Sequence, residues 1–410
     1  MSNKIIYADN SATTKVREEV ISAMNAVFRD DFGNPSSIHQ YGRKAKLLLT
    51  SSREKTALVI NAKPEEIFFT SGGTESDNTV IFGIAKLVEA KQLKKSRHII
   101  TSSIEHPAIK APLEYLEKKG WQIIWLPVDN EGFIDLKELE SAISPQTALV
   151  SIIHANNEIG TIQDLKKITS ICKKNDVLFH TDAVQSFGKI PIDVQDMNID
   201  FLSVSSHKIY GPKGAGALYI KDKNKIAPLI IGGGQENNLR SGTENLPGIA
   251  GFSTAAYLLK QELLENSKRL RKLQITLMEK LLKCKKIIFT GAGLEKVKEN
   301  IPVEKFLYRI PGHVSFCVQN TEGENLVLQA DLRGIAISSG SACSSKDIEK
   351  PILEPSHILK AIKVRQDYIK GSLRITLGRE NTEEDVSYIS ETIKTIINSL
   401  VGASQWDALQ

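Results

Sequence analysis

Two groups of opposite charge follow neighbouring strand-like segments near the middle of the chain. Asp182 lies in the segment 180–185, and Lys208 closes the segment 205–208. A lysine that forms a Schiff base and a carboxylate that keeps a pyridine nitrogen protonated are the two groups that pyridoxal-phosphate (PLP) chemistry requires. The alternative is structural: Asp182 caps a helix, and Lys208 is a surface lysine at a strand end. The turn-rich segment 209–214 that follows Lys208 favours a ligand site.

A glycine-containing segment, 70–78, follows another strand-like run and opens a helical pattern. It reads Thr-Ser-Gly-Gly-Thr-Glu-Ser-Asp-Asn. Glycines let backbone N–H groups approach an anion closely, and the start of a helix adds a favourable dipole, so the segment suits a phosphate. An ordinary capping box from Thr74 to Asp77 would explain the same residues without a ligand.

Two further side chains, His106 and Cys343, are suited to chemistry. His106 follows a third strand-like run, where an imidazole can stack on an aromatic cofactor and move protons; a lone histidine is more often structural. Cys343 lies among small polar residues in 338–345. That setting predicts an exposed and mobile thiol, whereas the apolar neighbours of Cys317 predict a core position.

Composition excludes several classes of protein. The four cysteines are Cys172, Cys284, Cys317 and Cys343, and they form no C-x-x-C pair. Neither a disulfide framework nor a zinc site is therefore expected. The cysteine content indicates a protein of a reducing compartment. The net charge of +5 is spread over 410 residues, and no segment approaches the ~20 apolar residues of a membrane helix. We expect a cytoplasmic protein with no direct contact to nucleic acid and none to a membrane.

Strand-like and helical segments alternate from about residue 66 to residue 220. The predicted strands are 67–69, 98–100, 123–125, 148–153, 177–179 and 201–204, and the predicted helices include 74–87, 107–118 and 165–173. This alternation predicts an α/β fold whose mainly parallel sheet is covered by helices and gathers ligands at the carboxyl ends of its strands.

After Gly248 the pattern changes to a long helix, fewer strands and a final helix over about 383–400. We assign 15–260 to a large domain, and 1–14 with 261–410 to a small α+β domain. The sequence alone does not decide which domain the first strand joins. A mobile cysteine loop is expected at about 338–351.

These motifs occur in one order along nearly the whole chain, and jointly they are specific. The chain resembles cysteine desulfurases of the NifS/IscS type, in the class V aminotransferase group of fold-type I PLP enzymes. The matching segments are 8–14, 33–39, 70–78, 105–106, 154–160, 182–185, 205–214, 232–236, 240–245, 338–345 and 373–375. The resemblance implies a seven-stranded sheet in the large domain.

The resemblance also implies a role for individual residues. Lys208 would hold PLP, Asp182 would pair with its pyridine nitrogen, Gln185 would bind its ring hydroxyl, and His106 would stack on the ring. The phosphate would be bound by Gly73, Thr74, Ser205 and His207, and by Thr243 from a partner subunit, which implies a homodimer. The substrate carboxylate would meet Arg374, Asn34 and Asn157, because a guanidinium fork suits bidentate binding.

The implied reaction takes sulfur from L-cysteine. Lys208 would remove the Cα proton, the Cys343 thiolate would attack the substrate sulfur, and L-alanine would leave. The persulfide on Cys343 would pass to an acceptor protein, for iron–sulfur cluster assembly or for tRNA or cofactor thiolation. Cys343 itself would contact a nascent cluster, and no resident metal is implied.

Alternatives remain at this stage. A selenocysteine lyase, another class V aminotransferase and a non-catalytic assembly platform share parts of the pattern, although a transaminase would not need Cys343. The pair Asn237-Asn238 stands where the family often carries Arg-Gly. The segment 346–351 looks like an insertion that either changes the acceptor or is neutral.

Overall fold

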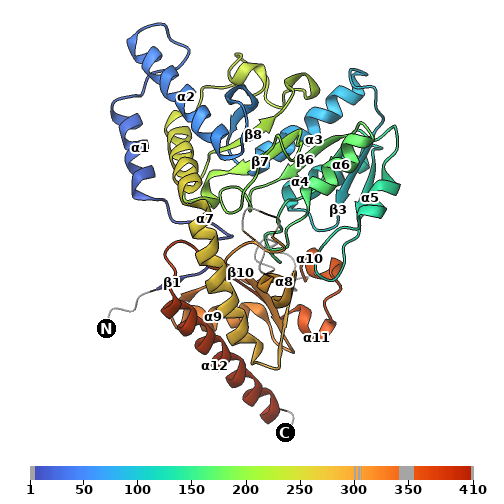
Figure 1. Ribbon diagram of the computed structural model, residues 1–410, viewed down its shortest axis with the longest axis vertical. Helices are drawn as coiled ribbons and strands as arrows, with labels where there is room; N and C mark the ends of the chain where they lie inside the picture. Colours follow the sequence, from blue (N-terminus) through green and yellow to red (C-terminus); the bar gives the residue numbers. More distant parts are fainter. Residues whose placement is uncertain (1–4, 300–301, 303–304, 306, 341–354, 408–410) are drawn as a thin grey trace.

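A seven-stranded sheet forms the centre of the larger unit (Figure 1). The computed structural model describes residues 5–299, 302, 305, 307–340 and 355–407. The strands are β2 (Ile67–Thr70), β3 (His98–Ser102), β4 (Gln122–Leu126), β5 (Leu149–Ser151), β6 (Leu178–Asp182), β7 (Phe201–Ser205) and β8 (Gly216–Ile220). Their order is β2-β8-β7-β6-β5-β3-β4, and only β8 pairs antiparallel with its neighbours. The predicted mainly parallel sheet is confirmed.

Helices bury both faces of this sheet. One face packs under α3 (Gly73–Glu89) and α4 (Pro107–Lys118), and its apolar core includes Phe68 and Ile99. The other face packs under α2 (Gln40–Val59), α6 (Leu165–Lys174) and α7 (Leu246–Leu282). Covered on both faces, the central strands are continuously apolar rather than alternating, which is why their positions were predictable. Outside this pair of layers lie α1 (Glu18–Arg29) and α5 (Leu136–Ala142).

A second apolar core lies below the sheet in Figure 1. Its sheet is antiparallel, with β10 (His313–Val318) between β9 (Ile287–Phe289) and β12 (Ser372–Thr376). Two helices cover it, α9 (Gly323–Asp331) and α12 (Glu383–Asp407). The short strand β1 (Ile6–Tyr7) pairs in parallel with β11 (Ile335–Ala336), so the first strand belongs to this unit. Short helices complete it: α8 (Leu294–Lys298), α10 (His357–Ala361) and α11 (Gln366–Ile369).

The two cores share one helix. The 37 residues of α7 would extend about 55 Å as a straight helix. Leu259 packs in the core of the large sheet, whereas Leu270 and the residues after it pack in the second core. The helix therefore continues through residue 260, where the sequence predicts a domain boundary.

Candidate functional site

A cavity of about 220 Å³ opens at the carboxyl edge of the large sheet. The position follows from the fold, because the carboxyl ends of parallel strands and the loops after them meet at one edge. The lining residues are Ser11, Gly73, Thr74, Asp77, His106, Ile153, Asn157, Asp182, Val184, Gln185, Ser205, His207, Lys208 and Arg374. Ten of the thirteen predicted site residues thus lie together, and we call this cavity the site.

One end of the site is built by the start of α3. Gly72 has a φ of 153°, and α3 begins at Gly73 with no side-chain cap, so the capping-box alternative is wrong. A Cβ atom on Gly73 would lie 2.6 Å from a methyl carbon of Val184. The close approach requires glycine, and the first N–H groups of the helix have no partner within it. Thr74, Ser205 and His207 line the same cavity.

Asp182 lies at the floor of the site, at the end of β6. Its Oδ1 accepts a hydrogen bond from the backbone N–H of Val184 at 2.8 Å, which forms a local turn rather than a helix cap. Burial raises the pKa of the Asp182 carboxyl, and the positive charges of His106 and Lys208 oppose that shift. A carboxylate buried in this way is stabilised by a cationic ligand.

Two more buried carboxyl groups lie close enough to Asp182 to feel its charge, and neither was predicted as a site residue. Asp77 lines the site, and burial together with the charge of Asp182 raises its pKa well above the usual value. Burial raises the pKa of the Glu105 carboxyl to about 8; its Oε1 accepts from Ser102 Oγ and from Ile153 N. Both residues lie inside predicted segments, 70–78 and 105–106, so an acidic side chain near Thr74 or His106 was the available signal.

The titration of Glu105 gives a prediction for the cofactor-free protein. Its pKa is higher in the folded state than in the unfolded state, so its contribution to stability is complete below pH 4.5 and is lost as the pH rises through about 8. Relative to Glu105→Gln, the wild type should lose up to about 1.4 kcal/mol of unfolding free energy per pH unit in that window. Denaturant unfolding of both proteins at pH 5, 7 and 9 measures this difference, and parallel pH curves would contradict it.

His106 caps α4 and faces the site with its other nitrogen. Its Nδ1 accepts a hydrogen bond from the backbone N–H of Ala108 at 3.1 Å, so in the neutral ring the proton is on Nε2. Burial lowers the pKa of His106, opposed by the charge of Asp182. The ring therefore presents an N–H group to the cavity.

Lys208 enters the site from the short helical turn after β7. Its Nζ donates to the main-chain oxygens of Ser11 and Ala12, both at 2.7 Å. Gln185 Nε2 donates to the same oxygen of Ser11 at 3.0 Å. Lys208 lines the cavity and is half-buried, so the surface-lysine alternative is wrong.

Arg374 closes the opposite end of the site. Nη1 donates to the main-chain oxygen of Asn157 at 2.9 Å, and Nη2 pairs with Asp9 Oδ1 at 3.0 Å. Its buried Nε has no partner among the described residues, and neither has the buried Oδ1 of Asn157. An orphaned guanidinium N–H beside an amide suits a carboxylate ligand. Asp9, which orients Arg374, was missed by the sequence analysis although it lies in a family-like segment.

The flanks of the predicted cysteine loop lie against this end. Ser338 Oγ donates to Asp9 Oδ2 at 2.7 Å, and Ser338 pairs with Arg374 as a β-bridge. On the other flank, His357 Nε2 contacts the main-chain oxygen of Glu105 at 3.0 Å. Cys343 and the segment 346–351 lie outside the described residues.

The other three cysteines lack the features of a reactive thiol. Burial raises the pKa of Cys172 and of Cys317 to about 12, which leaves both as thiols at neutral pH. Cys284 is partly buried against the second core. The predicted core position of Cys317 is confirmed.

Asn34 and Thr243 do not line the site of their own chain. Both are exposed, and Asn34 Oδ1 accepts from the backbone N–H of Ser36 in a local turn. The structure does not bring Asn34 to the site, and its predicted substrate contact stays a prediction. The segment that carries Thr243 is held by an ion pair between Arg240 and Glu75 at 2.9 Å.

The cavity fits PLP on the chemistry of its donors and acceptors. A glycine-built helix start suits the phosphate, the buried Asp182 suits a protonated pyridine nitrogen, and Lys208 is in reach of both in the same cavity. Among the described residues no cluster of His, Cys, Asp or Glu suits a metal ion. No helix in the described ranges is long and apolar enough to cross a membrane.

Comparison with known proteins agrees with this geometry. The family described as aminotransferase class-V matches residues 6–389. A protein named cysteine desulfurase IscS from Dictyoglomus turgidum is 45% identical over 395 residues, which covers 96% of this chain and 95% of the relative.

Two solved structures are similar as well. One, titled NifS-like protein, is 38% identical with a TM-score of 0.85, and the similarity covers 96% of this chain and 99% of that one. Another, titled SspA in complex with cysteine, is 35% identical with a TM-score of 0.74, and the similarity covers 91% of this chain and 98% of that one. By this match to the family and this identity to its members, the chain belongs to the cysteine desulfurases of the class-V aminotransferase family.

Proposed function

We propose that this chain converts L-cysteine to L-alanine and carries the released sulfur as a persulfide on Cys343. The observation that supports this role for Cys343 is the position of its flanks. Ser338 bonds to Asp9, which orients Arg374, and His357 contacts the backbone of Glu105, the residue before His106. Cys343 follows Gly340 by three residues, and three residues of extended chain span at most about 11 Å.

The substrate carboxylate binds at the Arg374 end. The unpartnered Nε of Arg374 donates to one carboxylate oxygen, and the amide group of Asn157 lies on the same side of the cavity. Asp9 and the Asn157 main chain already hold the two terminal nitrogens, so the guanidinium is oriented before substrate arrives. The solved SspA structure with cysteine supports an amino-acid ligand in a site of this fold.

Asp182, Gln185 and the start of α3 hold the cofactor. Gly73, Thr74, Ser205 and His207 would bind the phosphate, Asp182 would accept a hydrogen bond from the protonated pyridine nitrogen, and Gln185 would bind the ring hydroxyl. His106 would stack on the ring. When bound, PLP supplies a cationic ring that accepts the electron pair released at the substrate Cα.

The side chains of this chain then move protons and sulfur. Lys208 Nζ takes the Cα proton, for which a neutral amine is required. His106 Nε2, which carries the proton of the neutral ring, returns that proton to the carbon. The Cys343 thiolate forms a bond to the substrate sulfur while the carbon–sulfur bond breaks; its electron pair stays with the carbon, which gains a proton. One thiol and one cysteine thus give one persulfide and one alanine, with no external oxidant.

An aminotransferase is the alternative that this proposal must exclude. It would consume an oxo acid and would leave the thiol of cysteine in place. We expect the purified enzyme with PLP and L-cysteine to form alanine and, under a thiol reductant, sulfide in equal amounts without any oxo acid. Chromatographic alanine and colorimetric sulfide assays measure both products. Alanine that appears only after an oxo acid is added would overturn the proposal.

We further propose that two copies of the chain form the working enzyme. The linking segment between α1 and α2 and the helices beside it expose apolar side chains on the large unit. They include Phe28, Phe32, Ile38, Tyr41 and Leu47. Apolar groups gathered in this way favour a protein interface, here with a second copy, because exposed Thr243 is left to serve another site.

Complementation between two inactive variants tests the shared site. In a mixed dimer, one subunit carries Thr243→Glu and the other carries Lys208→Ala. The first subunit keeps its own Lys208 and receives the unchanged Thr243 of the second, so one of the two sites is intact. Co-expression in equal amounts should restore about one quarter of wild-type sites by random pairing. Thr74→Glu with Lys208→Ala is the matched control; it should restore none, because Thr74 serves its own chain. Equal activity from both mixtures, or from neither, would contradict the shared site.

The destination of the sulfur is also proposed. A protein acceptor, such as an iron–sulfur scaffold or a thiolation carrier, takes the persulfide at the exposed end of the site, in the cytoplasm. The division into domains 15–260 and 1–14 with 261–410 remains our proposal as well, and the two apolar cores support it with the boundary inside α7.

A further inference from the structure

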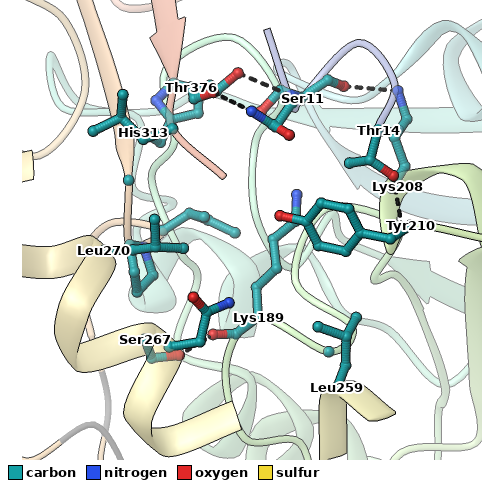
Figure 2. Close-up of a pocket in the computed structure, with 17 residues that line it drawn as sticks. Ser11, Thr14, Lys189, Lys208, Tyr210, Leu259, Ser267, Leu270, His313 and Thr376 are labelled. Atoms are coloured by element: carbon teal, nitrogen blue, oxygen red, sulfur yellow. Dashed lines mark hydrogen bonds between the residues drawn. The ribbon is translucent and has the colours of Figure 1, made fainter. Parts of the chain in front are cut away.

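Behind the site lies a second cavity that is lined by another lysine (Figure 2). Lys189 extends into it from the turn after β6, and its main-chain oxygen accepts from Ser267 Oγ of α7. Ser11 and Lys208 line both this cavity and the site. In the view of Figure 2 the side chain of Lys189 rises toward Ser11, and its nitrogen appears beside the hydroxyl end of Tyr210.

Among the residues that the structure describes, Lys189 Nζ makes one hydrogen bond, to Gln185 Oε1 at 3.2 Å. On its other side Gln185 Nε2 donates to the main-chain oxygen of Ser11 at 3.0 Å. The main-chain oxygen of Ser11 can only accept, so it binds the NH₂ end of the amide, and Lys189 Nζ donates to the oxygen end. Gln185 Nε2 keeps one N–H free of these contacts.

We propose that Lys189 is a positioning residue, which holds the amide of Gln185 so that an N–H, and not the amide oxygen, faces the ring hydroxyl of the bound cofactor. This inference rests on the proposed function. Its chemical consequence is that the hydroxyl meets a donor, which stabilises the ionised oxygen. With the amide reversed, the same oxygen would face another oxygen and would have to keep its proton.

The surroundings of Lys189 disfavour its charged form. Burial, followed by the charges of Lys208 and Arg374, lowers its pKa to about 7. His207 and His313 lie close enough that Lys189 also lowers their pKa values. A buried amine among other cations costs free energy of folding, so we expect Lys189→Met to unfold no more easily than the wild type.

The experiment compares Lys189→Met, Gln185→Leu and the double variant, each as holoenzyme. Lys189→Met should raise the dissociation constant of PLP about tenfold, the value of one hydrogen bond to a charged group. It should also shift the pH at which the visible absorbance of the bound cofactor changes, in the same direction as Gln185→Leu. The double variant should do little more than the larger single change, since both act through one amide.

Two further variants complete the test. Lys189→Arg, which keeps a donor, should restore much of the wild-type absorbance titration. Lys86→Met, which removes an exposed lysine that donates to the Pro228 main chain, should change neither readout. Unchanged PLP affinity and titration in Lys189→Met, or fully additive effects in the double variant, would overturn the inference. A wild type that binds no PLP would instead overturn the proposed function.

Discussion

Replacing Cys343 with serine should abolish sulfide release from L-cysteine while leaving PLP binding intact. Serine keeps the size of the side chain, but its hydroxyl is a far weaker nucleophile toward sulfur than a thiolate. We expect sulfide production to fall about 10³-fold or more, in the range seen when an acting catalytic group is removed. Visible absorbance of the bound cofactor reports binding, and mass spectrometry of the intact protein after incubation with cysteine reports the persulfide.

A matched control comes from the other cysteines. Cys284→Ser changes a thiol that is partly buried against the second core and does not line the site, so sulfide release should be unchanged. Sulfide release by Cys343→Ser at the wild-type rate would remove Cys343 from the reaction. A persulfide found on Cys284 in the wild type would move the assignment to that residue.

Replacing Lys208 with alanine should remove both covalent attachment of PLP and the base. Lys208 is the one lysine among the described residues that line the site, and its Nζ donates to the main-chain oxygens of Ser11 and Ala12. We expect alanine formation to fall at least about 10³-fold, because loss of a general base alone costs 10²–10⁴-fold. Borohydride reduction followed by peptide mass spectrometry locates the attached cofactor, which should be absent from the variant.

Lys213 supplies the control for this substitution. It is exposed, lies five positions after Lys208 and does not line the site. Lys213→Ala should keep both the attached cofactor and the activity. Cofactor attached to Lys189 in the Lys208→Ala protein would mean that Lys189 can replace Lys208, and the role given to Lys208 would need revision.

Local pattern was sufficient to predict six strands of the large sheet and, in the site, the segment 70–78, His106, Asp182 and Lys208, whereas the family resemblance implied the other site residues. The six predicted strands follow from apolar runs that are buried on both faces, and each functional motif directly follows such a run. The strand β8 was missed because Gly214 and Gly216 precede its short apolar run and favour a turn. Its antiparallel pairing depends on two strands distant in sequence, which local periodicity does not report.

The site residues that were not predicted were missed for one physical reason. Asp9 matters through its ion pair with Arg374, and Lys189 through a cavity between two units of the fold. Asp77 lies inside a segment that also has a plain structural explanation as a cap. A buried charge is recognised by what surrounds it after folding, and sequence neighbours do not supply that information.

The contact between Asp9 and Arg374 has a consequence for the order in which the protein becomes functional during its synthesis. The two residues are separated by 365 positions, and Lys208 is held by the main chain of Ser11 and Ala12. A ribosome-bound chain that has just emerged through β8 contains all seven strands of the large sheet, with Lys208 and Asp182, but lacks Arg374. Such a nascent chain can fold its sheet, but the substrate end of the site closes only when β12 has left the ribosome.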